Sequence, residues 1–289
     1  MISHGTLHLC PPVFSHYQTA DLLQAKQAGK ATAICSMNLG ISSVEVQLHP
    51  DRLSFPNGIT LSWEQIKEID ADHDNCFSLS DNTLQAIKAY SADNGRSFSL
   101  LPTADAPSLV IAGFPMHRIK QITPLCAADY MVEAISPCRG RILDTATGLG
   151  YTAIAAAKKA KQVITIEYDP ISQEMAHQNP WSQELFANPV ITQIIGDSAL
   201  EIEKFADTSF AAILHDPPSM ALAGGLYAET FYRQTLRILT AKGKMFHYIG
   251  DPDSAMGARV TKGVIQRLHA AGFRKVVRMP KEFGVVAYK

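Results

Sequence analysis

Four acidic residues, Asp144, Glu167, Asp197 and Asp216, each stand at or just after the end of a short apolar segment. If these segments are strands of one doubly wound sheet, the acids meet at a single edge, because ligands of such sheets lie beyond the carboxyl ends of the strands. Carboxylates gathered there can hold hydroxyl or ammonium groups and can take up a proton. The four acids are therefore the first candidates for a binding and catalytic site.

The elements that must position these acids alternate regularly. Segments of strand length occur at 141–144, 162–167, 190–196, 210–215, 243–249 and 275–279, and the chain closes on 285–288. Stretches of helical character lie before and between them, among them 125–135 and the Ala-rich 151–161. Strands that alternate with helices are typical of a parallel, doubly wound α/β sheet. We therefore expect a Rossmann-like α/β domain over residues 116–289.

A loop with two glycines, Gly148 and Gly150, follows the first of these strands. Glycine lets the backbone turn tightly and come close to a ligand, and amides at the start of the next helix would face an anionic or polar group. With Ala153, the spacing also satisfies the G-x-G-x-x-A pattern of dinucleotide-binding loops. Asp144 favours a cofactor that carries a methionine moiety over a dinucleotide. Its carboxylate would repel a pyrophosphate but can hold the ammonium group of the methionine moiety.

The remaining acids extend this pocket. Glu167 stands 17 residues beyond Gly150, where a carboxylate can accept both hydroxyl protons of an adenosine ribose. Asp197 is expected at the adenine end, although an acid after a strand also often caps the next helix. The expected cofactor contacts are Asp144, Thr145, Ala146, Thr147, Gly148, Gly150, Tyr151, Thr152, Glu167, Tyr168, Asp197, Ser198 and Asp216.

Taken in order, the motifs at 144–150, Glu167, Asp197 and Asp216-Pro217-Pro218 resemble those of class I S-adenosylmethionine-dependent methyltransferases over 141–289. The closing segment 283–288 is similar to the antiparallel last strand of that superfamily. The segments 144–152 and 226–232 look like a group of predicted archaeal-type methyltransferases related to spermidine synthases. A small β domain before the Rossmann-like one is also similar to spermidine synthases. The resemblance implies S-adenosyl-L-methionine as cofactor and methyl transfer as the reaction.

The residues after Asp216 limit the classes of methyl acceptor that we expect. In methyltransferases that act on planar amines, an aromatic residue follows the two prolines, whereas this chain has Ser219, with Tyr227 as another candidate for an aromatic face. A cysteine near the ends of the fourth or fifth strand, which methylation of cytosine C5 in RNA requires, is missing. We therefore expect a small molecule or a protein side chain as acceptor. The expected acceptor contacts are Arg118, Pro217, Ser219 and Tyr227.

Methyl transfer to a neutral nucleophile needs orientation of the acceptor and a group that takes up its proton. We expect Asp216 to orient the acceptor and His215 or His117 to take up the proton. A hydrogen-bonded structural role is the alternative for His215, and an ion pair between the domains is the alternative for the segment 116–118.

The N-terminal part, 1–115, is expected to form a small, mostly β domain that encloses the acceptor or builds a homodimer. The segment Pro56-Asn57-Gly58 lies between 52–55 and 59–62, and an Asn-Gly pair between alternating segments predicts a hairpin. Further predicted strands are 44–48, 76–79 and 98–101, with one helix over 82–90.

The composition of the chain limits which partners and which cellular compartment we expect. The chain has 289 residues with 26 Lys and Arg against 27 Asp and Glu, so its balanced charge argues against a nucleic-acid partner. The spacing of the five cysteines, Cys10, Cys35, Cys76, Cys126 and Cys138, fits neither a disulfide framework nor a zinc site, which indicates reduced thiols, a cytoplasmic protein and no metal. The segment Met1–Gly5 does not begin an export signal, and no apolar run is long enough for a bilayer.

Three other functions remain open. An aminopropyltransferase of the spermidine-synthase kind would need extra acids to hold a polyamine, and Asp251 and Asp253 are the obvious additions. A catalytically silent binding protein could keep the same fold, although acids at four strand ends argue against it. An NAD oxidoreductase is compatible with the glycine spacing alone.

Overall fold

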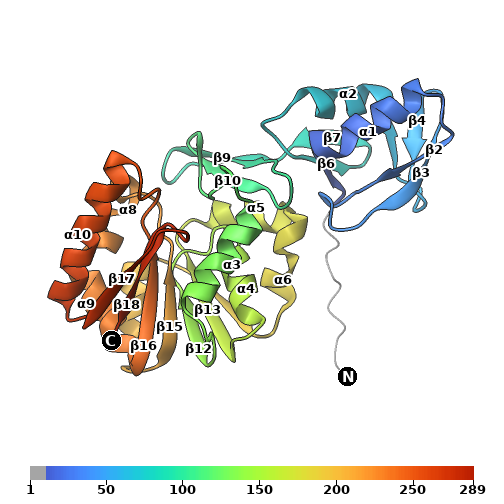
Figure 1. Cartoon of the computed structure of the whole chain (residues 1–289). Helices are drawn as coiled ribbons and strands as arrows, with labels where there is room; N and C mark the ends of the chain where they lie inside the picture. Colours follow the sequence, from blue (N-terminus) through green and yellow to red (C-terminus); the bar gives the residue numbers. More distant parts are fainter. Residues whose placement is uncertain (1–10) are drawn as a thin grey trace, which may run out of the picture. The chain divides into compact units, whose positions relative to one another are not determined.

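The computed structural model describes residues 11–289, with the backbone alone at Met256, and it divides into two compact units (Figure 1). The first unit comprises the chain up to Thr123 together with Glu174–Gln183, and the second comprises Pro124–Gln173 and Glu184–Lys289. The boundary between the units thus follows Thr123, whereas the sequence suggested residue 115. The sequence also did not suggest that Glu174–Gln183 belongs to the first unit. Met1–Gly5 and Cys10 lie outside the described residues.

A seven-stranded mixed sheet forms the centre of the second unit, in the order β14-β13-β12-β15-β16-β18-β17. Its strands are β12 (Arg141–Asp144), β13 (Gln162–Glu167), β14 (Ile191–Ile195), β15 (Phe210–His215), β16 (Leu239–Tyr248), β17 (Lys275–Met279) and β18 (Gly284–Tyr288). The pairs from β14 through β16 are parallel, and β18 is antiparallel to both β16 and β17. The predicted α/β alternation and the antiparallel last strand are therefore confirmed.

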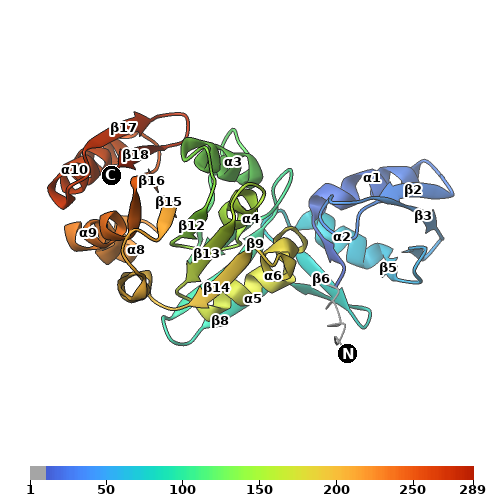
Figure 2. The ribbon, with the colours of Figure 1, turned by 90° about the horizontal axis from the view of Figure 1, so that it is seen from below.

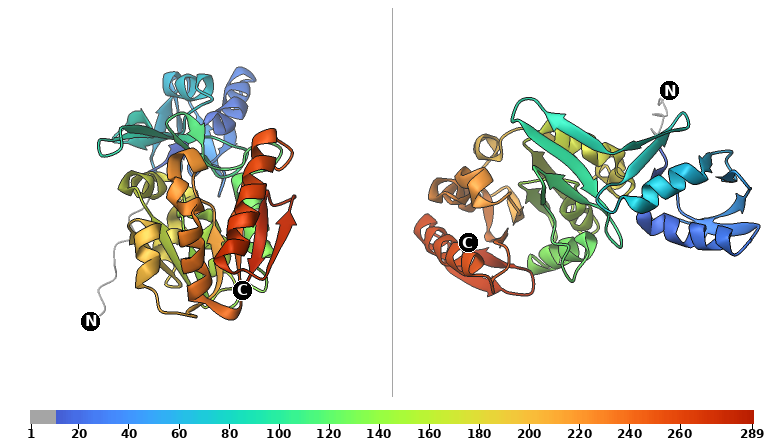
Figure 3. Two further views of the ribbon diagram at one scale, coloured as in Figure 1. Left: turned by 90° about the vertical axis from the view of Figure 1, so that its left-hand side faces the viewer. Right: turned by 90° about the horizontal axis from the view of Figure 1, so that it is seen from above.

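Helices cover both faces of this sheet (Figures 2 and 3). Figure 2 shows α3 (Pro124–Ala134) and α4 (Tyr151–Ala157) on one side, with α9 (Glu229–Ile238) and α10 (Ala255–Ala271) on the other. The smaller helical elements along this part of the chain are α5 (Pro170–Gln178), η1 (Pro180–Ser182), α6 (Gln183–Ala187), α7 (Ser198–Glu201), η2 (Ile202–Lys204), α8 (Met220–Ala223) and η3 (Gly224–Tyr227). Because the sheet is covered twice, its central strands are apolar along their length, as β13 shows with Val163, Ile164 and Ile166 buried.

Helix α4 ends at Ala157, whereas the sequence predicted a helix over 151–161. The chain then turns, and the Lys161 amide donates to the Gly140 carbonyl at 2.8 Å. This hydrogen bond brings the start of β13 beside the start of β12.

Over residues 11–123, the first unit contains three antiparallel sheets and the helices α1 (His16–Gln27) and α2 (Trp63–Ala71). The sheets are β1-β6-β7, β2-β3-β4-β5 and β11-β10-β9-β8. Their strands are β1 (Val13–Phe14), β2 (Thr32–Cys35), β3 (Val44–Leu48), β4 (Arg52–Ser54), β5 (Thr60–Ser62), β6 (Phe77–Ser80), β7 (Thr83–Ala86), β8 (Lys88–Ser91), β9 (Arg96–Leu101), β10 (Ser108–Ile111) and β11 (Phe114–Pro115). The hairpin predicted at Pro56-Asn57-Gly58 joins β4 to β5.

The helix predicted over 82–90 is wrong, because these residues form β7 and β8. Asp81 and Asn82 take positive φ angles of 50° and 60°, as the central residues of a two-residue hairpin turn do, and so join β6 to β7. Helix α2, by contrast, was not predicted. Its start is marked by a capping box in which Gln65 N donates to Ser62 Oγ and Ser62 N donates to Gln65 Oε1.

Within residues 11–289, none of the helices combines the length and apolar character that a membrane-spanning segment requires.

Candidate functional site

The acids predicted from the sequence follow four adjacent strands of the second unit. Asp144 and Glu167 end β12 and β13, while Asp197 and Asp216 come directly after β14 and β15. Because these strands are parallel neighbours, all four acids lie at the carboxyl edge of the sheet, onto which the right-hand view of Figure 3 looks. The order of the strands changes direction between β12 and β15, so Asp144 and Asp216 flank the switch point where such sheets bind ligands.

Asp144 is fully buried and hydrogen-bonded within the fold. Its Oδ2 accepts from Thr152 Oγ1 at 3.0 Å and from Thr165 Oγ1 at 3.1 Å. Burial nevertheless raises the pKa of the Asp144 carboxyl group to about 7, because the two hydroxyl donors offset only part of the desolvation. Thr165 was not predicted as a site residue, although a polar side chain inside the apolar run 163–166 was a usable signal.

Asp216 differs from Asp144 in its surroundings. Its side chain is half-buried, and within residues 11–289 no hydrogen bond or ion pair to its carboxyl group is found. Burial raises the pKa of Asp216 to about 7, and the neighbouring charge of Asp144 acts in the same direction. Asp216 is therefore a carboxyl group with open oxygens that changes protonation near neutral pH.

The loop of residues 145–150, called the cofactor loop below, needs its two glycines for different reasons. Gly150 has φ of +80°, and a Cβ there would lie 2.7 Å from Leu185 Cδ2, so this glycine permits close packing. Gly148 has φ of +53°, but a Cβ there would meet nothing within 4 Å. The backbone at Gly148 therefore has free space beside it, into which a ligand could approach.

Glu167 is tied to the cofactor loop. Its Oε2 accepts from Gly148 N at 2.7 Å, and its Oε1 accepts from Asp169 N at 3.0 Å. Burial raises the pKa of Glu167. A carboxylate offers about four acceptor positions, so capacity remains for a hydroxyl group. The neighbouring Tyr168 side chain is 68% exposed.

Asp197 and Ser198 both have structural partners. Asp197 Oδ1 accepts from Ala199 N at 2.8 Å and so caps α7, which is the alternative that the sequence had left open. Ser198 Oγ donates to the Thr145 carbonyl at 2.6 Å. Ser198 therefore helps to hold the cofactor loop, whereas Asp197 holds the start of α7.

His215 is fully buried and hydrogen-bonded through both ring nitrogens. Its Nε2 lies 3.0 Å from the Leu226 carbonyl oxygen, and its Nδ1 lies 2.6 Å from Thr145 Oγ1. Since a carbonyl can only accept, Nε2 carries the proton and Nδ1 accepts from the threonine hydroxyl. Burial lowers the pKa of His215 to about 3. In this arrangement neither nitrogen is open to a substrate, so the structural role is favoured over that of a base.

The other predicted acceptor residues are placed as follows. Tyr227 is only 5% exposed, and its hydroxyl donates to the Pro218 carbonyl at 3.2 Å, so it packs against the segment instead of presenting an open aromatic face. Pro217 is buried and Ser219 is exposed. Residues 217–228 are called the acceptor segment below.

His117 and Arg118 belong to the first unit. The Leu109 amide donates to His117 Nδ1 at 3.3 Å, and burial lowers the pKa of His117 to about 4. Arg118 is half-buried. Both residues closely follow the hairpin formed by β10 and β11. That they contact an acceptor stays a prediction.

Near the acceptor segment lie three further residues that were not among the predicted site residues, Tyr232, His247 and Arg267. Tyr232 and His247 are buried, with Tyr232 Oη 2.9 Å from His247 Nε2. Arg267 Nε donates to the Tyr227 carbonyl at 2.7 Å. His215 and His247 have ring centroids 4.4 Å apart, so the four polar side chains form one internal cluster with Tyr227.

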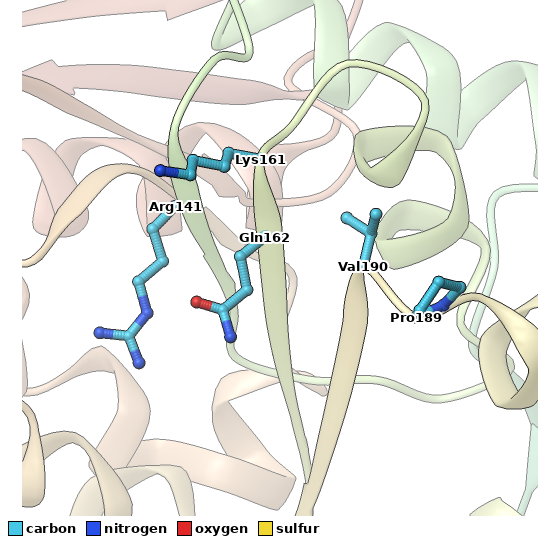
Figure 4. Close-up of a pocket in the computed structure, with 5 residues that line it drawn as sticks. All are labelled: Arg141, Lys161, Gln162, Pro189 and Val190. Atoms are coloured by element: carbon cyan, nitrogen blue, oxygen red, sulfur yellow. The ribbon is translucent and has the colours of Figure 1, made fainter.

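A surface hollow of about 500 Å³ lies at the opposite edge of the sheet from the acids (Figure 4). It is lined by Arg141, Lys161, Gln162, Pro189 and Val190, at or next to the starts of β12, β13 and β14. Figure 4 shows the Arg141 and Gln162 side chains extending to the same side, as expected for residues paired in register. The hollow is therefore separate from the predicted site. Among residues 11–289, no group of three or more His, Cys, Asp or Glu side chains is arranged to hold a metal ion.

Comparison with solved structures places the fold. A spermidine synthase from Thermotoga maritima superposes with a TM-score of 0.56, at 17% identity over 77% of this chain and 82% of that one. A spermidine synthase in complex with the transition-state analogue AdoDATO superposes with a TM-score of 0.58, at 17% identity over 77% of this chain and 83% of that one. At this identity the likeness establishes a shared fold.

No family model matches the sequence. An uncharacterized protein of Methanocaldococcus jannaschii, MJ1233, is 39% identical over 237 residues, which cover 81% of this chain and 80% of the relative. With the fold and the strand-end acids described above, this degree of identity means that the chain belongs to the same protein family as MJ1233.

Proposed function

We propose that the second unit is a transferase that binds S-adenosyl-L-methionine and transfers its methyl group to a small molecule or a protein side chain. The observation that carries the proposal is the Asp216 carboxyl group, half-buried at the switch point and without an internal partner among residues 11–289. A carboxyl group in this position can hold an acceptor and take up its proton.

The residues of the cofactor loop and its surroundings fit a positively charged cofactor. In their ionised forms, Asp144, Glu167 and Asp216 give the carboxyl edge negative charge, which favours a sulfonium group and disfavours the pyrophosphate of a dinucleotide. The free space beside Gly148 and the remaining acceptor capacity of Glu167 suit a nucleoside. Gly148, Glu167 and Asp197 would hold the cofactor, which when bound supplies a methyl group on a positively charged sulfur.

The chain's own residues supply orientation and proton uptake. Asp216 would hold the nucleophile of the acceptor and, in its ionised form, accept the proton that the nucleophile releases. Because the pKa of Asp216 is about 7, the ionised form predominates above neutral pH, and turnover should rise as the pH increases through 7. His215 remains neutral and is hydrogen-bonded to the Thr145 hydroxyl and to the Leu226 carbonyl. In this proposal Asp216 therefore takes the role of base that the sequence had suggested for His215 or His117.

Calorimetric titration of the purified full chain with S-adenosyl-L-methionine, its decarboxylated form and NAD tests the cofactor. We expect S-adenosyl-L-methionine to bind and NAD not to bind. Tight binding of NAD without either sulfonium ligand would refute the proposal.

The acceptor can be sought by adding purified protein and S-adenosyl-L-methionine to a cell extract and searching by mass spectrometry for a molecule that gains one methyl group. Asp216→Asn should still bind the cofactor, because Asp144 and Glu167 remain, and should lose transfer. Asp93→Asn, at an exposed position in the turn between β8 and β9, is the matched control and should keep both. If Asp216→Asn transfers methyl groups at the normal rate, the role of Asp216 is wrong.

Aminopropyl transfer is a second candidate, and the likeness to two spermidine synthases over 77% of the chain favours it. In the same titration, this function requires that the decarboxylated cofactor bind more tightly than S-adenosyl-L-methionine.

A further inference from the structure

A chain of hydrogen bonds connects the cofactor loop to the acceptor segment through the protein interior. Ser198 Oγ donates to the Thr145 carbonyl at 2.6 Å, Thr145 Oγ1 donates to His215 Nδ1 at 2.6 Å, and His215 Nε2 donates to the Leu226 carbonyl at 3.0 Å. Ser198, Thr145 and His215 are all buried. Three segments that follow different strands are thus held by one continuous set of contacts.

The Thr145 hydroxyl favours one proton arrangement, because it lies 2.6 Å from His215 Nδ1 and 3.4 Å from its other acceptor, the Leu214 carbonyl oxygen. The Leu226 carbonyl can only accept, so His215 carries its proton on Nε2 and leaves the lone pair on Nδ1 for the Thr145 hydroxyl. A planar imidazole also fixes the distance between its two nitrogens. A displacement of Thr145 therefore either breaks its short hydrogen bond or moves the ring, and movement of the ring changes the contact with Leu226.

The acceptor segment is held at its ends and loosely packed between them. Arg267 Nε donates to the Tyr227 carbonyl at 2.7 Å, and Tyr227 Oη donates to the Pro218 carbonyl at 3.2 Å. Between these contacts, α8 has no buried residue, and Met220 and Leu222 are each 38% exposed. Elements with few buried contacts open at low free energy, so the position of this segment depends on its few anchors.

We propose that His215 couples the cofactor loop to the acceptor segment, so that a ligand on the loop fixes the segment and the cofactor binds before the acceptor. The inference rests on the proposed function for the identity of the ligand. It follows from linkage, because a ligand that favours one position of Thr145 also favours the state of Leu226 that is joined to it. His215 is in this sense a positioning residue.

Hydrogen exchange of the full chain, followed by mass spectrometry, tests the coupling without any ligand. Thr145→Val removes the hydroxyl that bonds to His215, and we expect exchange in residues 219–228 to become about tenfold faster, which corresponds to about 1.4 kcal/mol of opening free energy. Thr152→Val is the matched control, because Thr152 bonds to Asp144 and not to His215. It should change exchange near α4 alone. Equal effects of the two variants on 219–228, or no effect of Thr145→Val, would overturn the inference.

A second measurement uses S-adenosyl-L-methionine as the probe. In the unmodified chain it should slow exchange in 219–228 about tenfold. His215→Gln can still donate to Leu226 but no longer offers the Nδ1 acceptor to Thr145. Its ligand-free exchange in 219–228 should therefore be about as fast as in Thr145→Val, and it should lose the response to the cofactor. If calorimetry shows no binding while Thr145→Val still accelerates 219–228, the proposed cofactor is wrong and the coupling holds. If the cofactor binds and 219–228 does not respond in the unmodified chain, the coupling is wrong and the proposed function stands.

Discussion

Replacing Asp216 by asparagine should stabilise the protein, and the gain should grow with pH. Burial raises the pKa of Asp216 from its ordinary value of 3.8 to about 7, so the folded protein keeps a proton there that the unfolded chain releases. The stability contributed by this proton is fully present below about pH 4 and is lost as the pH rises through 7. Asparagine carries no such proton and removes this dependence.

The size of the stabilisation expected for Asp216→Asn follows from the same two pKa values. A rise from 3.8 to about 7 corresponds to at most about 4 kcal/mol at alkaline pH. Because the side chain is only half-buried, solvent screens part of this energy, and we expect a gain of about 1 to 2 kcal/mol near pH 8. Near pH 4 the two proteins should differ little in stability, since the carboxyl group is then neutral in the folded state and only about half ionised in the unfolded chain.

Urea unfolding followed by far-ultraviolet circular dichroism near pH 4, 6 and 8 measures this difference. Asp253→Asn is the control, because that side chain is exposed, and its stability should follow the unmodified chain at each pH. A difference for Asp216→Asn that does not change with pH would refute the reasoning, because it would mean that the carboxyl group is not desolvated. A loss of stability near pH 8 would instead mean that the carboxylate has a stabilising partner.

Three further substitutions test the surroundings of the site by urea unfolding. Gly150→Ala should lower stability by about 2 to 4 kcal/mol, because φ is +80° and the new Cβ would meet Leu185, and a cost below 1 kcal/mol would contradict this. Tyr232→Phe should cost about 1 to 2 kcal/mol, because His247 Nε2 loses its buried partner, and an unchanged midpoint would show that the hydrogen bond contributes nothing. Glu167→Gln should cost about 1 to 3 kcal/mol, because an amide cannot accept from two backbone N–H groups through both of its ends, and calorimetry should show at least tenfold weaker binding of S-adenosyl-L-methionine. Retention of full affinity would remove Glu167 from the proposed cofactor site.

The alternation of strands and helices in the second unit was predictable because it depends on local patterns. The strand-length segment 162–167 contains the largely apolar run 163–166, and the acid at its end marks the edge where the strand leaves the core. The first unit was less predictable. The segment 82–90 has no strong period, and its conformation depends on the turn at Asp81 and Asn82 and on pairing with β6 and β9.

The sequence by itself determined which residues stand at the ends of the central strands, and thereby the acids Asp144, Glu167 and Asp216, because strand length, apolar runs and glycine turns are written in neighbouring residues. The tertiary structure alone decided what those residues do there. Thr145 and His215 are 70 positions apart, yet their contact makes His215 a neutral, fully bonded side chain instead of an open base. Likewise Asp144 is bonded to Thr152 and Thr165 while Asp216 has no partner in the described part of the chain. Protonation and hydrogen bonding depend on burial and on groups brought close from distant strands, and local sequence carries neither.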